Sequence, residues 1–173
     1  MKTFSIALIS VAALSLSGCM KGPQDATQMR QMAGGMLVTQ SSVVVPRSPS
    51  AVNATLARGA QKCFNRTVTS TMARPGMYGA PGGYSTIAQM YRSSFRTSGG
   101  RGELTLRQTG VSGAIFTSGK DGAIAYVVDT APVSGGTKLT MYAGRFGYQP
   151  LNDGVVGWAR GGPLLCPDMP AGM

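Results

Sequence analysis

The first nineteen residues constrain the fold of this chain more than any other segment, because they decide the compartment in which the rest folds. Lys2 precedes an apolar run from Phe4 to Leu16, and small residues follow it up to Cys19. A basic start, a short apolar stretch and a small-residue cleavage site are the three parts of a secretory signal. The run is shorter than the roughly 20 apolar residues of a membrane-spanning helix. We therefore expect residues 1–18 to be cleaved as a signal peptide.

The end of this leader resembles the lipobox of bacterial lipoproteins in the four residues Leu16-Ser17-Gly18-Cys19. The resemblance covers the leader and nothing beyond it, and the family of the mature domain is not recognised. It implies cleavage before Cys19 and attachment of palmitate-like acyl chains to its sulfur atom. Two or three chains anchor a protein stably, because each buried methylene contributes about 0.8 kcal/mol. The alternative is an ordinary cleavable signal that leaves Cys19 as a third thiol.

The residue after the cysteine bears on which membrane the anchor enters. Met20 stands where the inner-membrane retention signal of enteric lipoproteins has an aspartate. The resemblance thus implies a location in the cell envelope, lipid-anchored in the outer membrane and facing the periplasm.

Two cysteines remain once Cys19 carries lipid, and both belong to an exported chain. Cys63 and Cys166 are therefore expected to form a disulfide, as thiols in oxidising compartments do. The bridge closes a loop of about 100 residues, which corresponds to a gain of roughly 4 to 5 kcal/mol. A reactive or metal-binding pair is the alternative, but the chain offers no CxxC spacing and no histidine to support it.

The mature chain is strongly basic and long enough for one domain. Removal of Lys2 with the leader lowers the formal net charge from +10 to +9. Such a charge favours anionic partners, for instance an acidic protein face or an anionic envelope polymer, although it also serves solubility. We expect residues 19–47 to be a lipidated N-terminus and flexible tether, and residues 48–173 to be a single domain.

Apolar, β-prone residues inside the predicted tether leave another possibility open. Residues 36–38 and 43–45 could add an edge strand to the domain or to a partner, whereas Gly34 and Gly35 break any helix started over 26–33. A linker lying on the domain is the interpretation that we favour from the sequence.

The rest of the chain predicts an α+β domain. Ser48 and Pro49 begin a helix that runs to about Phe64, and a second helix is predicted over 150–159. A Gly/Pro-rich loop follows at 74–83. About four or five antiparallel strands are predicted at 84–96, 103–109, 112–118, 122–130 and 137–144, with 112–118 and 122–130 forming a hairpin. This order predicts a two-layer sandwich of a β-meander and two helices. In layout, without a shared motif, it is similar to the helix-grip domains of accessory lipoproteins in outer-membrane β-barrel assembly.

The residue types that carry most enzyme chemistry are missing or dispersed. The chain has no histidine, and its six carboxylates are scattered singly along it. That composition disfavours triads, zinc sites and a glycosidase-like carboxylate pair. We therefore expect a protein that is not an enzyme, with no catalytic residue, no metal and no cofactor.

A stretch rich in arginine is the best candidate for a ligand-binding face. Arg92 and Arg96 alternate with aromatic residues on one predicted strand, and Arg101 and Arg107 follow nearby. Arginine forks suit phosphate and carboxylate groups, and the aromatic residues Tyr91 and Phe95 could stack on a ligand. The alternative is a solvated sheet face whose aromatic residues belong to the core. Nucleic acid is not an expected partner for a protein in the cell envelope.

Three functions follow as hypotheses. The first is a lipid-anchored envelope protein that binds another envelope component through its basic face or its tether. The second is a carrier of a lipid or other apolar ligand, in a cavity between the sheet and the C-terminal helix lined by Leu104, Val127, Leu139 and Trp158. The third is a purely structural lipoprotein.

Overall fold

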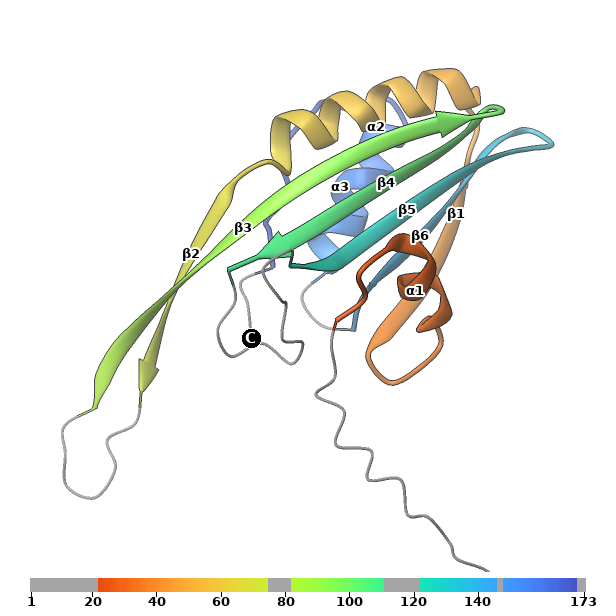
Figure 1. Ribbon diagram of the computed structural model, residues 1–173. Coiled ribbons are helices and arrows are strands. Elements are labelled where there is room, and N and C mark those ends of the chain that lie inside the picture. Colours follow the sequence, from red (N-terminus) through yellow and green to blue (C-terminus); the bar gives the residue numbers. More distant parts are fainter. Residues whose placement is uncertain (1–21, 75–81, 111–121, 146–147, 171–173) are drawn as a thin grey trace, which may run out of the picture.

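The computed structural model describes residues 22–74, 82–110, 122–145 and 148–170, and its centre is one curled antiparallel sheet (Figure 1). The strand order is β1-β6-β5-β4-β3-β2. The strands are β1 Val38–Val45, β2 Thr67–Arg74, β3 Gly83–Ser98, β4 Arg101–Thr109, β5 Ala123–Val133 and β6 Gly136–Gly144. The helices are α1 Ala26–Gln31, α2 Pro49–Cys63 and α3 Gln149–Ala159. The predicted α+β class with an antiparallel sheet is confirmed, but the predicted order of helix, meander and helix is corrected, because α1 and β1 precede the long helix α2.

The first long helix, α2, forms where its capping signal predicts it. The Ser48 hydroxyl accepts a hydrogen bond from the amide of Ala51, and Pro49 occupies the first helical position, where its missing N–H has no cost. Four apolar residues recur at helical spacing and are all buried against the sheet: Val52, Leu56, Ala60 and Cys63. Cys63 lies on the same stripe and points towards the core.

The last helix, α3, packs beside α2 on the same face of the sheet (Figure 1). Its buried side comprises Leu151, Val155, Trp158 and Ala159. The Trp158 ring lies 5.3 Å from that of Phe64, measured between centroids. It can approach α2 closely because residue 59 is glycine, where an added Cβ would lie 2.5 Å from the indole ring. The predicted helix over 150–159 is confirmed.

A disulfide between Cys63 and Cys166 closes the domain, as predicted from the export signal. The segment after α3 runs back along α2, where Lys62 donates a hydrogen bond to the Leu164 carbonyl at 3.1 Å. Arg66 donates another to the Pro167 carbonyl at 2.7 Å. The disulfide and these two hydrogen bonds hold residues 164–167 against the C-terminal end of α2.

The predicted tether is corrected by the structure from residue 22 onwards. Residues 26–31 form α1, and β1 pairs in antiparallel register with β6, Val38 opposite Gly144. The strand forms because β6 otherwise presents an unpaired edge, and Val38 and Val45 are buried when it does. The edge strand that the sequence left open is thus what the structure contains, in place of a flexible linker.

Two strand predictions also need correction. The strand β2, which the sequence did not predict, pairs with the first half of β3 in a long hairpin that extends past the helix-covered part of the sheet (Figure 1). The predicted partner of 122–130 is wrong, because β5 has β4 on one edge and β6 on the other. Residues 112–118 and most of the predicted 74–83 loop lie outside the described residues.

The sheet has a core on each face, of unequal size. On the face covered by α2 and α3, twenty buried residues form one cluster. On the opposite face α1 covers a smaller cluster of Ala26, Met29, Val38, Ile124 and Val127. The predicted two-layer sandwich has helices on one face only, whereas α1 shields the part of the opposite face around β5. In the part of the chain that the structure describes, no helix covers the area of this face over β3 and β4, and the predicted site residues Arg92, Arg96, Arg101 and Arg107 lie on these two strands.

Candidate anion-binding face

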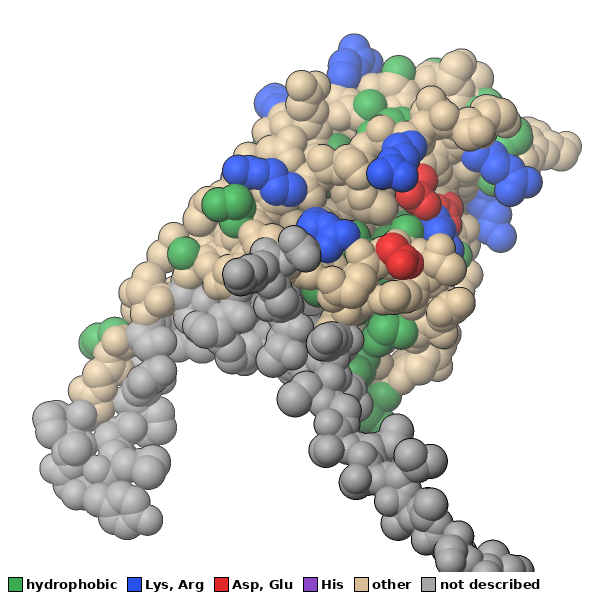
Figure 2. Space-filling model, viewed as in Figure 1, with side chains coloured by type: hydrophobic (Ala, Val, Ile, Leu, Met, Phe, Trp, Pro, Cys, Tyr) green, Lys and Arg blue, Asp and Glu red, His purple; other side chains and the backbone are tan. Residues whose placement is uncertain are grey.

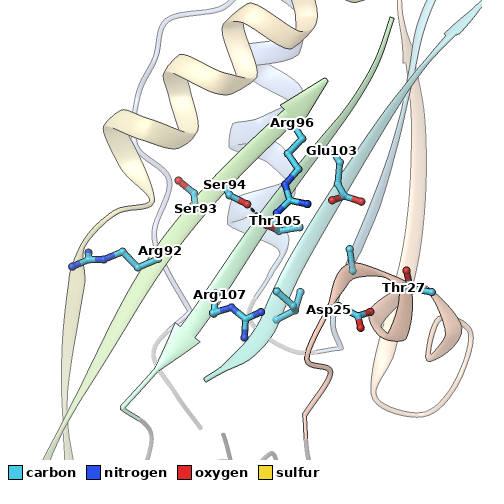
Figure 3. A pocket seen from close by; sticks show the side chains of 11 residues that line it. Asp25, Thr27, Arg92, Ser93, Ser94, Arg96, Glu103, Thr105 and Arg107 are labelled. Carbon is cyan, nitrogen blue, oxygen red and sulfur yellow. Dashed lines mark hydrogen bonds between the residues drawn. The ribbon is translucent and has the colours of Figure 1, made fainter. Parts of the chain in front are cut away.

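Alternation along β3 and β4 sorts their side chains onto two faces. Leu104 and Leu106 point into the large core and are fully buried, so Glu103, Thr105 and Arg107 point the other way. On that side, β3, β4 and α1 surround a hollow of about 510 Å³ (Figure 3). Its lining comprises Asp25, Ala26, Thr27, Arg92, Ser93, Ser94, Arg96, Glu103, Thr105, Arg107 and Ile124. We call this open side of the sheet the arginine face.

Arg96 is the predicted site residue that is most available for a ligand. It is exposed, lies opposite Glu103 in the strand register, and its side chain extends over the sheet towards Thr105 (Figure 3). Among the described residues its guanidinium has no hydrogen-bond partner, and Glu103 accepts its hydrogen bond from Arg30 instead. The Ser94 and Thr105 hydroxyls lie 2.7 Å apart beneath it. Five guanidinium donors therefore stand over two hydroxyl groups.

Arg107 lies in the same hollow but has structural partners. It donates a hydrogen bond at 2.7 Å to the carbonyl of Gln24 and a longer one at 3.5 Å to the carbonyl of Gly122. These bonds hold the chain before α1 against the end of the sheet. Its positive charge adds to that of the arginine face, while its N–H groups donate hydrogen bonds that stabilise the fold.

The other two predicted arginines are set apart from this pair. Arg92 lines the hollow with its stem but points away from Arg96 and Arg107, towards β2 (Figure 3). Arg101 lies at the far end of β4 and lines an adjoining hollow of about 600 Å³, to which Arg96 also contributes. The four arginines therefore share one face but not one binding point, and Arg96 connects the two hollows.

A fifth arginine on this face was missed from the sequence. Arg30 of α1 donates to both oxygens of Asp129, at 2.8 and 2.6 Å, and to Glu103 at 2.5 Å. Its hydrogen bonds with Asp129 are the main cause of a raised pKa for Arg30, so the guanidinium stays charged at any relevant pH. Arg30 was missed because it lay in the presumed tether, 99 and 73 residues from its partners.

The two aromatic residues between the arginines are not part of the ligand face. Tyr91 is fully buried, and Phe95 packs against the large core on the other side of the sheet. The Tyr91 hydroxyl donates to Gln89 or to the Pro170 carbonyl, each at 2.8 Å, and burial raises the pKa of this phenol. For these aromatics the core interpretation is confirmed, and neither of them lines the two hollows of the arginine face.

Charge on this face is mixed but positive overall. Its two hollows are lined by five arginines and three carboxylates, and in Figure 2 basic side chains spread across the face with acidic ones among them. The acidic groups are engaged: Asp25 accepts the amide of Gln28 as the cap of α1, and Arg30 binds Glu103 and Asp129. The five arginines outnumber these three carboxylates, so the net charge of the face is positive.

Other kinds of site find little support in the described ranges. Within them no group of three or more His, Cys, Asp or Glu side chains could hold a metal ion, and no helix is long and apolar enough to cross a membrane.

The four residues predicted to line an apolar cavity do not share one. Leu104, Leu139 and Trp158 belong to the large core, each at most 1% exposed, while Val127 lies in the small core on the opposite face. Cys19, the predicted lipidation site, lies outside the described residues.

Comparison with known proteins gives no family. The sequence matches no family model, and none of the curated proteins matches it. Among solved structures, a distant similarity is found to protein CV1439 from Chromobacterium violaceum, a structural-genomics target solved by X-ray crystallography. The match has 14% sequence identity and a TM-score of 0.33, and covers 71% of this chain and 90% of that one. The similarity assigns neither a family nor an activity.

Proposed function

We propose that this protein is a non-enzymatic lipoprotein of the bacterial envelope that binds an anionic component through its arginine face. The observation that carries the proposal is Arg96, an exposed guanidinium above two hydroxyls with no hydrogen-bond partner among the described residues. A planar guanidinium of this kind suits phosphate and carboxylate oxygens, which accept paired hydrogen bonds from it.

The position of Arg96 outside the large core supports the same proposal. Burial on the α2 and α3 side stabilises the domain, and Arg96 takes no part in that packing. A residue that the fold does not require is free to serve binding. The anchor is supported by the lipobox ending at Cys19, and the expected location is the outer membrane facing the periplasm. We also propose that the curled sheet, with α2 and α3 packed against it, is a helix-grip fold.

The test is a pull-down from gently solubilised membranes with three forms of the protein. The wild type is compared with Arg92→Gln/Arg96→Gln and with Arg58→Gln/Arg160→Gln, in which both arginines are exposed on or beside the helices. The two variants remove the same charge from opposite sides. We expect one anionic envelope component, whether a protein, a polymer or a phospholipid, to be retained by the wild type and the control pair and lost from the Arg92/Arg96 pair. Equal retention by all three forms, or no retained component, would contradict the proposal.

A further inference from the structure

The described chain begins on the arginine face, next to the arginines themselves. Gly22 and Pro23 are already buried, and the Pro23 carbonyl accepts a hydrogen bond at 2.7 Å from the amide of Ile124. The next carbonyl, that of Gln24, accepts one at 2.7 Å from Arg107. Asp25 then lines the same hollow as Arg96. Residues 23–25 are therefore fixed to this side of the sheet.

The distance from this fixed point to the proposed anchor is short. Gln24 is five positions after Cys19, and a fully extended chain spans at most about 3.6 Å per residue, so Gln24 lies within roughly 18 Å of the acylated cysteine. The hydrocarbon of a bilayer is about 30 Å thick and its headgroup layers bring it to about 40–45 Å. An acylated Cys19 thus holds Gln24 and its partner Arg107 within reach of the headgroups.

From these two observations we infer that the arginine face docks onto the anionic headgroups of the bilayer that holds the acyl chains. The inference rests on the proposed function, since it takes acylation of Cys19 as given, and it names lipid phosphate as the anionic component. Each basic residue near an anionic membrane surface strengthens binding by about fivefold, an effect that salt screens. Arg92, Arg96 and Arg101 are exposed and positioned to add to that attraction.

The character of the face favours a lipid surface over a protein partner. Protein interfaces concentrate their binding energy in exposed aromatic and large apolar anchors. In the described ranges the large exposed apolar side chains are Met36, Val44, Tyr84, Met90, Val133 and Leu165, and none of them lines either hollow. The arginines are spread along two strands, an arrangement that suits many separate phosphates better than one ligand.

The test follows the chemical reactivity of individual arginines in the full mature protein. The protein is purified from membranes and placed in nanodiscs of phosphatidylcholine alone or of phosphatidylcholine with phosphatidylglycerol. Phenylglyoxal then modifies accessible arginines, and mass spectrometry measures each site. Arg58 and Arg160 serve as internal controls, because they are exposed on or beside the helices that cover the other face.

We expect modification of Arg92 and Arg96 to be several-fold slower in the anionic discs than in the neutral ones, and to recover at high salt, while Arg58 and Arg160 react equally in both. Equal reactivity in both discs on an acylated protein would overturn the docking and leave the anchor intact. Protection in native membranes but not in anionic discs would also overturn it, and would indicate a protein partner. Acyl groups absent from Cys19 would overturn the proposed function and the docking together.

Discussion

The two faces of the sheet differ in what their side chains do. On one face, residues such as Leu104, Tyr126 and Leu139 are completely buried under α2 and α3. On the other, α1 covers a cluster of five residues, and the rest of the surface carries arginines and hydroxyl groups. Burial of apolar area dominates folding stability, so the first face holds the domain together, and the exposed arginines of the second face can change with little cost. Separating the two tasks leaves a charged surface available without weakening the core.

The largest effect is expected from the bridge on the helix-covered face. In Cys63→Ser/Cys166→Ser the loop of about 100 residues opens, and we expect the free energy of unfolding to fall by about 4 to 5 kcal/mol. Urea unfolding of the variant, and of the reduced wild type as control, measures the loss. An unchanged midpoint would show that the arrangement of α2 against the C-terminal segment does not depend on the bridge.

A smaller loss is expected where α3 meets α2. Gly59→Ala places a methyl group 2.5 Å from the Trp158 ring, and displacing that ring should cost about 1 to 3 kcal/mol. Gly157→Ala is the matched control, since its Cβ meets nothing within 4 Å, and alanine should stabilise α3 by about 0.5 to 1 kcal/mol. Chemical denaturation of both variants tests the packing. Equal effects would mean that Trp158 does not lie against residue 59.

On the arginine face, the largest stability effect is expected at Arg30. Its side chain is 30% exposed, so we expect Arg30→Gln to lose about 1 kcal/mol, with Glu103 and Asp129 left facing each other. Arg30→Lys keeps the charge but not the paired hydrogen bonds, and should lose less. Thermal unfolding at low and high salt separates the charge from the geometry. A glutamine variant as stable as the wild type would show that α1 is held by its apolar residues alone.

The smallest effect is expected at Arg96. Arg96→Gln removes a guanidinium without a hydrogen-bond partner among the described residues, so the free energy of unfolding should stay within about 0.5 kcal/mol of the wild type. The same thermal unfolding experiment measures it. A loss as large as that of Arg30→Gln would make Arg96 structural and remove the distinction between the two faces.

Predictions from the sequence were right where the signal is local. Ser48 and Pro49 mark the start of α2, and the apolar stripe along that helix gives its buried side. The pairing of Cys63 with Cys166 followed from the leader, because only two thiols remained for an oxidising compartment. Alternation of apolar and polar residues along β4 likewise places Glu103 and Arg107 on the polar side of the strand.

The predictions from the sequence were wrong or incomplete where contacts between distant segments determine the structure. The strand β1 forms by pairing with β6 at the other end of the chain, and its own sequence also suits a linker. Arg30 becomes part of the candidate site through Asp129, a contact that no spacing in the sequence indicates. Arg92 was grouped with Arg96 by alternation, which gives the face of a strand but not the direction of a long side chain across it.

The proposed function and the membrane docking both depend on the chemistry of Cys19, and the intact mass of the mature protein purified from membranes tests that chemistry most directly. We expect a chain that begins at Cys19 and carries the added mass of two or three acyl groups. A chain that retains its first eighteen residues, or one that begins at an unmodified cysteine, would contradict the account.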